Sequence, residues 1–156
     1  MRHTISVLVE NKFGVLARIA GLFSARGYNI ASLAVSETMD PSISCMTIVV
    51  EATDEKILEQ IKKQLNKLID VIRIADFTKK EHAERELILA KVACSLKDKA
   101  KLENTLKKYV AKIIQHKEGL AIIEAVDEQA KIKQLLEALN EFGIVELIRT
   151  GKIAMA

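Results

Sequence analysis

Residues 5–30 read ISVLVENKFGVLARIAGLFSARGYNI and contain an expected strand, a break and an expected helix, in that order. Ile5, Val7 and Val9 stand at every second position, which is typical of a strand with one face more buried than the other. The break is centred on Gly14. After it, apolar residues recur three and four positions apart, as they do on one face of a helix. This stretch therefore predicts a strand that passes through a short loop into an amphipathic helix.

The first half of the chain continues through further expected elements up to Phe77. Gly27 is the expected left-handed residue just beyond the first helix. Thr53 and Asp54 are expected to cap a second helix, whose apolar residues again recur at helical spacing. Further strands are expected over residues 28–37, 43–52 and 71–77. The order is strand, helix, strand, strand, helix, strand, which is typical of a ferredoxin-like antiparallel sheet with both helices on one face.

The second half repeats this order after a polar stretch, residues 78–84, that we interpret as a linker. The expected strands cover residues 87–95, 111–116, 120–126 and 143–149, and the expected helices cover residues 98–109 and a segment that Asp127 opens. The fold class predicted is α+β, with two tandem ferredoxin-like βαββαβ domains. They span residues 1–77 and 85–156.

Composition excludes several classes of function. The 156 residues are 49% hydrophobic and 29% charged, with a net charge of +3, as expected for a soluble folded protein. Lysines alternate with glutamates instead of forming a basic block, and aromatic residues make up only 4%, so nucleic-acid binding is not favoured. No apolar run approaches the roughly 18 residues of a membrane span. The N-terminus leads directly into the first strand, so we expect a cytoplasmic protein without a signal peptide.

The residue types that usually carry catalysis or bind metals are scattered. Cys45 and Cys94 form no CxxC pair and are expected to be small buried hydrophobic residues. His3, His82 and His116 lack metal-ligand spacing and are expected to lie exposed on the surface. GxSxG, P-loop and GxGxxG motifs are absent. We therefore expect no catalytic, cofactor-binding or metal site in this chain.

The break around Gly14 has two possible explanations from the residues alone. One is a plain turn, in which Gly14 supplies an unusual backbone angle and Asn11 acts like an N-cap. The other is a small-molecule site, because a glycine at a helix N-terminus leaves backbone N–H groups open to a carboxylate. Asn11 and Asn29 could add amides that both donate and accept hydrogen bonds, which suits a free amino acid.

Several short motifs resemble those of a known family. The pattern N-x-x-G-V-L followed by G-Y-N-I resembles an ACT domain. The longer string over residues 22–30, with DPSIS at 40–44 and MTI at 46–48, is similar to the regulatory (small) subunits of acetolactate synthase, also called acetohydroxyacid synthase. In the second half, EREL at 84–87 and RTG at 149–151 resemble the same family.

The resemblance implies a regulatory subunit that is not itself an enzyme. Its partner would be a catalytic large subunit that uses thiamine diphosphate, Mg and FAD to join pyruvate to a second 2-keto acid in branched-chain amino-acid synthesis. The small subunit would activate that partner and confer feedback inhibition, most often by valine. Its ACT domain, residues 1–77, would form a homodimer with the effector at the interface. The effector-binding residues carried over are Asn11, Gly14, Val15, Leu16, Asn29 and Ile30.

Two other hypotheses remain. A free-standing ACT-type amino-acid sensor acting on another partner would be expected to carry a helix-turn-helix or a basic recognition helix, and the sequence shows neither. A ferredoxin-like enzyme with an unseen site would need titratable side chains clustered in one loop. Valine, leucine and isoleucine all suit an apolar pocket, so the sequence does not choose among them.

Overall fold

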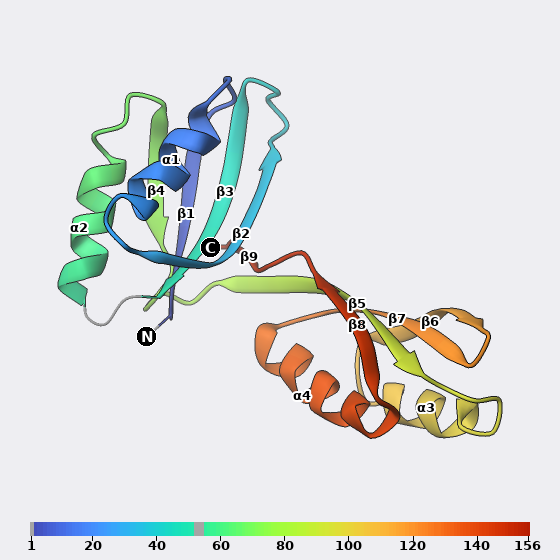
Figure 1. Ribbon diagram of the computed structural model, residues 1–156. Coiled ribbons are helices and arrows are strands. Elements are labelled where there is room, and N and C mark those ends of the chain that lie inside the picture. Colours follow the sequence, from blue (N-terminus) through green and yellow to red (C-terminus); the bar gives the residue numbers. More distant parts are fainter. Residues whose placement is uncertain (1, 52–54) are drawn as a thin grey trace. The chain divides into compact units, whose positions relative to one another are not determined.

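The computed structural model describes residues 2–51 and 55–156, shown as a ribbon in Figure 1. The chain divides into two compact units: the first runs to Ala83 and also contains Lys152–Ala156, and the second is Glu84–Gly151. Each unit has the order strand, helix, strand, strand, helix, strand. The predicted fold class, two βαββαβ units of the α+β type, is confirmed.

The first unit is a four-stranded antiparallel sheet with two helices on one face (Figure 1). The strands lie in the order β2-β3-β1-β4, so β2 and β4 are the two edges. The elements are β1 (Arg2–Glu10), α1 (Val15–Ser24), β2 (Asn29–Glu37), β3 (Ile43–Glu51), α2 (Glu55–Leu65) and β4 (Val71–Asp76). The helix caps predicted at Thr53 and Asp54 lie outside the described residues.

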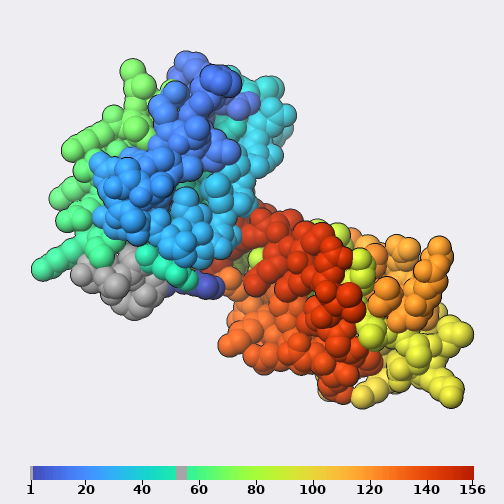
Figure 2. Space-filling view, in the orientation of Figure 1, coloured from blue at the N-terminus to red at the C-terminus, as the bar shows by residue number. Residues whose placement is uncertain are grey.

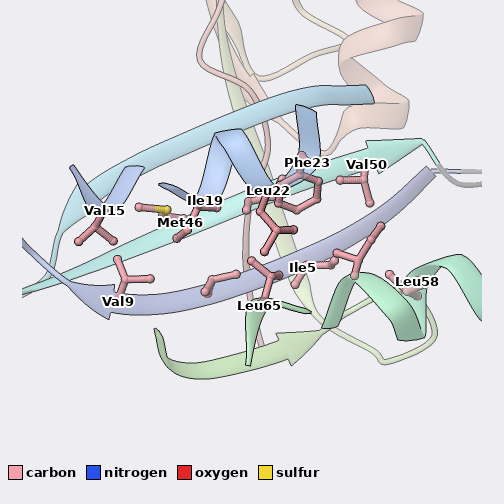
Figure 3. Close-up of a cluster of buried hydrophobic side chains, with 13 residues drawn as sticks. Ile5, Val9, Val15, Ile19, Leu22, Phe23, Met46, Val50, Leu58 and Leu65 are labelled. Atoms are coloured by element: carbon pink, nitrogen blue, oxygen red, sulfur yellow. The ribbon is translucent and has the colours of Figure 1, made fainter. Parts of the chain in front are cut away.

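The core of the first unit lies between the sheet and its helices (Figure 3). Ile5 on β1 pairs with Ile48 on β3, and both side chains are fully buried. Val15, Ile19 and Phe23 cover them from α1, as the helical spacing predicts. Each such side chain, fully buried, contributes about 1.5–3 kcal/mol to the stability of the unit.

The end of α1 has the geometry that its sequence predicts. Gly27 has a φ of 68°, in the left-handed region. Its amide donates to the carbonyl of Ser24 at 3.1 Å, and the amide of Tyr28 donates to the carbonyl of Phe23 at 3.0 Å. These two bonds make a Schellman motif, in which the left-handed residue is usually glycine. Tyr28 packs on the same apolar core as Phe23, so the chain turns directly into β2.

The second unit repeats the architecture with the strand order β6-β7-β5-β8. Its core is formed mainly by Ile88, Val92, Leu102, Ile123 and Ile132. The elements are β5 (Ala83–Ala93), α3 (Lys99–Leu106), β6 (Ala111–Lys117), β7 (Leu120–Asp127), α4 (Gln129–Leu139), a 3₁₀ turn over Asn140–Phe142, and β8 (Ile144–Arg149).

Two boundaries in this unit differ from the prediction. β5 begins at Ala83, inside the stretch interpreted as a linker. Glu86 is buried and accepts two hydrogen bonds from the Arg149 guanidinium, at 3.0 and 2.6 Å. Asp127 ends β7 instead of starting the helix, and its carboxylate accepts a hydrogen bond from the amide of Glu128.

The last residues of the chain belong to the first unit. Lys152 donates its backbone amide to the hydroxyl of Ser32 on β2 at 3.1 Å, and a short strand, β9 (Ile153–Met155), follows. This strand was not predicted, since three residues are too few to show a period. In the part of the chain that the structure describes, no helix is long and apolar enough to span a membrane.

Candidate effector site

The loop between β1 and α1 is short, and Gly14 determines its shape. Gly14 has φ 81° and ψ −5°, and it is the N-cap residue of α1. Its carbonyl accepts the amide of Arg18 at 2.9 Å, which is the first bond of the helix. A residue with a side chain would cost roughly 1–2 kcal/mol in this left-handed conformation. Glycine is therefore required here by the backbone, whether or not a ligand binds.

The N-terminus of α1 has amides that an anion could bind, apart from that of Val15, which donates to the carbonyl of Lys12 at 3.3 Å. No side chain caps it, and its first turn carries no acidic residue. The first-turn N–H groups of a helix have no acceptor within the helix, and the helix dipole places partial positive charge at this end. A carboxylate is the natural complement of such a terminus.

Asn11 does not act as the N-cap that one explanation of the loop predicts. Its side-chain amide donates to the carbonyl of Pro41 at 2.8 Å, and its backbone amide donates to the carbonyl of Ser42 at 2.7 Å. Asn11 therefore ties the loop that contains Gly14 to the connection between β2 and β3. Within the described part of the chain, no donor binds the carbonyl oxygen of its side chain.

Val15 and Leu16, the next predicted effector residues, have different environments. Val15 is 2% exposed, its side chain belongs to the core, and its amide donates to the carbonyl of Lys12 at 3.3 Å. Leu16 is 44% exposed, so its apolar side chain can contact a ligand at this end of α1. In Figure 2 the segment around residues 11–20 is drawn in blue.

Arg18 belongs to this loop region but was not among the residues predicted from the sequence. Its Nε and Nη2 atoms each lie 2.9 Å from Oδ2 of Asp70. Its Nη1 atom lies 3.2 Å from the position that a Cβ atom on Gly14 would occupy. The partner of Arg18 is 52 residues away in sequence, so no local pattern could reveal the pair.

Lys12, in the same loop, has its own partner. Its ammonium group lies 2.6 Å from the carboxylate of Glu10. The hydrogen bond and the charge of Glu10 raise the pKa of Lys12, so the lysine remains protonated and paired at neutral pH.

Asn29 and Ile30 lie at the other end of the sheet. In the sheet register, Asn29 on β2 is opposite Glu51 on β3, and Glu51 is opposite Arg2 on β1. Arg2 is the first residue of β1, whereas Asn11 follows the last residue of that strand. Eight residue steps along β1 correspond to about 26 Å. Within one chain the six predicted residues therefore form two groups: Asn11, Gly14, Val15 and Leu16 at one end, and Asn29 and Ile30 at the other.

The group at Asn29 has its own polar contacts. The Asn29 amide donates to one oxygen of the Glu51 carboxylate at 3.2 Å, and Arg2 binds the other oxygen at 3.2 Å. The hydrogen bonds from Asn29 and Arg2 lower the pKa of Glu51. This end of the sheet therefore carries a carboxylate that is ionised at neutral pH. Among residues 2–51 and 55–156, no donor binds the side-chain carbonyl oxygen of Asn29.

The histidines and cysteines form no site in the described residues, where no group of three or more His, Cys, Asp or Glu could hold a metal ion. The prediction that His3 is exposed is wrong. It is 2% exposed, because it lies on the helix-facing side of β1 opposite Val50. Cys94 is buried as predicted, and burial raises the pKa of its thiol, whereas Cys45 is only half-buried.

The chain resembles known proteins over both units. Residues 5–73 match the AHAS small subunit-like ACT domain, and residues 85–156 match the family described as the small subunit of acetolactate synthase. A probable acetolactate synthase small subunit of Archaeoglobus fulgidus is 44% identical, over 99% of this chain and 96% of that protein. The acetolactate synthase isozyme 3 small subunit of Escherichia coli is 39% identical, over 100% of this chain and 96% of that protein.

One solved structure has the same architecture. The acetolactate synthase small subunit from Thermotoga maritima superposes on this chain with a TM-score of 0.88. The two chains are 35% identical, and the match covers 99% of this chain and 96% of that one. The likeness therefore extends to both βαββαβ units.

Proposed function

The chain belongs to the family of acetolactate synthase small subunits, and from this membership we propose that it is a non-catalytic regulatory subunit that senses a branched-chain amino acid. It binds the catalytic large chain of the same enzyme, raises the activity of that chain and makes the activity sensitive to the amino acid, with valine as the first candidate. Thiamine diphosphate, Mg and FAD are proposed to belong to the catalytic chain.

One observation carries the proposal for the effector site, namely the separation of its residues into two groups at opposite ends of the sheet. Neither group alone surrounds a ligand. β2 is an edge strand of the sheet, and an edge strand is a template for pairing with another strand. If two copies pair antiparallel along β2, the Asn29 end of one copy lies beside the Glu37 end of the other.

This pairing would bring the two groups together. Glu37 leads into the β2–β3 connection, and Asn11 is hydrogen-bonded to that connection through Pro41 and Ser42. The group at Gly14 of one copy would then face the group at Asn29 of the other, twice in a two-fold dimer. The homodimer is thus part of the proposal, because it completes the site.

The paired groups suit the parts of a free amino acid. The effector's carboxylate would lie at the open N-terminus of α1, beside Gly14. Its ammonium group would meet the remaining carbonyl oxygen of Asn29, close to the ionised carboxylate of Glu51. Leu16 and Ile30 would contact its aliphatic side chain.

The test is reconstitution with the catalytic chain of the same source. Purified alone, the regulatory chain should form no acetolactate from pyruvate and should retain neither thiamine diphosphate nor FAD. Mixed with the catalytic chain, it should co-purify with it, raise its rate, and lower that rate when valine is added. Titrations with leucine and isoleucine would show which amino acid is preferred.

Three results would contradict the proposal. Turnover by the isolated chain would show that it is an enzyme. Failure to bind or activate the catalytic chain would remove the regulatory role. Valine binding without any effect on the catalytic chain would favour a sensor that acts on another partner.

A further inference from the structure

The Arg18 side chain is held in a fixed orientation beside Gly14. Two of its nitrogen atoms bind Oδ2 of Asp70 at 2.9 Å. Asp70 is 7% exposed, and its carbonyl accepts the amide of Glu10 at 2.9 Å, so it is tied to the end of β1. Charge-assisted hydrogen bonds to a buried carboxylate fix both the position and the plane of a guanidinium.

The opposite side of this guanidinium faces the place where a ligand would approach Gly14. Nη1 lies 3.2 Å from the position of a Cβ atom on Gly14 and has no hydrogen-bond partner among the described residues. The side chain is 49% exposed, so solvent and small molecules can reach it. A guanidinium has five N–H donors, and the bonds to Asp70 leave the Nη1 donors available.

The charges around the loop also favour an anion beside Arg18, in addition to the carboxylate of Asp70. The loop's other cation, Lys12, is already paired with Glu10. The first turn of α1 adds no acidic residue that could satisfy Arg18 from the helix itself. A carboxylate placed over Gly14 would therefore meet the oriented guanidinium of Arg18, whose Nη1 donors are not used by Asp70.

We propose that Arg18 is the residue that receives the effector's carboxylate, and that Asp70 positions it for this role. The inference rests on the proposed function and adds a specificity residue to its site. Arg18 distinguishes an effector with a free carboxylate from the same molecule with a neutral amide in its place. Gly14, without a side chain, leaves space for the ligand, and Arg18 favours a ligand that carries a negative charge there.

The experiment compares L-valine with L-valinamide by calorimetry on the full chain. In the wild type, valine should bind more tightly than valinamide. In Arg18→Gln, valine should bind about 10- to 100-fold more weakly, as expected when one charged hydrogen bond is lost. Valinamide affinity should change little, so the difference between the two ligands should shrink.

Two further variants separate this role from a structural one. Asp70→Asn keeps the arginine charged but loosens it, so valine should weaken less than in Arg18→Gln while the preference for valine over valinamide persists. Arg26→Gln is the matched control, because Arg26 is an arginine of the same unit that binds the Leu22 carbonyl and Gln64, away from Gly14. It should leave both affinities unchanged.

The outcomes are distinct. Unchanged valine affinity in Arg18→Gln, or an equal loss for valine and valinamide, would overturn the inference. If Arg18→Gln does not fold, loss of the valine preference in Asp70→Asn would overturn it instead. A wild-type chain that binds no branched-chain amino acid would refute the proposed function itself.

Discussion

At the scale of single residues, Gly14 has a structural requirement and a proposed functional one. Its φ of 81° requires glycine for the turn into α1, and its missing side chain leaves a space that Arg18 borders at 3.2 Å. The unusual backbone angle of the turn explanation and the ligand space of the site explanation are therefore compatible at Gly14, although Asn11 is not the N-cap that the turn explanation predicts. A substitution that probes the ligand must be separated from one that only strains the backbone.

Gly14→Asp should abolish feedback inhibition and leave activation of the catalytic chain largely intact. The new carboxylate would occupy the approach to the backbone, repel the effector's carboxylate and compete for Arg18. Allosteric coupling is typically about 1–3 kcal/mol, so losing one charged contact is enough to remove it at working concentrations. A valine titration of the reconstituted enzyme measures this, and Asn29→Ala should show a milder loss.

Gly14→Ala provides the matched control for that prediction. It imposes the same backbone strain without a charge, so it should lower the unfolding free energy by roughly 1–2 kcal/mol and weaken inhibition less than Gly14→Asp. If the alanine variant loses inhibition to the same extent, the effect of Gly14→Asp comes from strain alone. Full inhibition of Gly14→Asp at the wild-type valine concentration would place the effector elsewhere.

At the scale of elements, two glycines of the α1 region should respond in opposite directions to alanine. Gly21 lies inside the helix with no atom within 4 Å of a new Cβ, so Gly21→Ala should stabilise the chain by about 0.5–1 kcal/mol. Gly27 has equal space but a φ of 68°, so Gly27→Ala should destabilise it by roughly 1–2 kcal/mol. Urea unfolding of both variants measures the difference, and a change of the same sign in both would contradict the role assigned to the backbone angle.

The contact between α2 and β4 should depend on pH. Burial alone would raise the pKa of Asp76, but hydrogen bonds with Thr78 and Lys62 outweigh it and lower the pKa below the ordinary 3.8. A carboxyl group with a lowered folded-state pKa adds stability above its unfolded pKa, and this stability is lost as the pH falls through the folded value. Asp76→Asn should therefore reduce the unfolding free energy at pH 7, and this reduction should shrink as the pH falls below 3.8.

Urea unfolding at several pH values checks this prediction. Lys62→Met removes the same ion pair from the α2 side. It should therefore reduce the pH dependence of the unfolding free energy over the same pH range. An Asp76→Asn variant that loses as much stability near pH 3 as at pH 7 would show that the carboxylate charge is not the cause.

The elements that could be predicted are those with a long local period. The alternation at Ile5, Val7 and Val9 indicated β1, and Gly27 indicated the end of α1, because each signal lies within one element. The early start of β5 was missed, because the polar residues there show no apolar alternation, and the partner of buried Glu86 is Arg149, 63 residues away. β9 was missed because three residues show no period.

The candidate site was only partly predictable for the same reason. Its loop residues follow one another in sequence, so Asn11 and Gly14 could be selected together. Their separation from Asn29 depends on strand register, and the pairing of Arg18 with Asp70 depends on the tertiary fold. The burial of His3 likewise depends on which face of β1 the helices cover.

At the scale of the whole molecule, the effector site that we propose needs two copies of the chain. In light scattering at micromolar concentration, the wild type should therefore have the mass of a dimer. The structure offers a way to identify the edge involved, since the first unit has two edge strands, β2 and β4, and each carries a partly exposed aliphatic residue. Val35 on β2 is 40% exposed, and Ile72 on β4 is 52% exposed.

Val35→Lys should weaken the dimer, because a lysine on an edge strand opposes strand pairing, and Ile72→Lys should leave it intact. Valine affinity measured on the same samples should fall in Val35→Lys, since each site draws its two groups of residues from different copies. It should stay at the wild-type level in Ile72→Lys, the matched control. A monomeric wild type would remove the two-copy site. A dimer that Ile72→Lys disrupts and Val35→Lys does not would place the interface on β4, where the Asn29 end of one copy could not reach the Gly14 loop of the other.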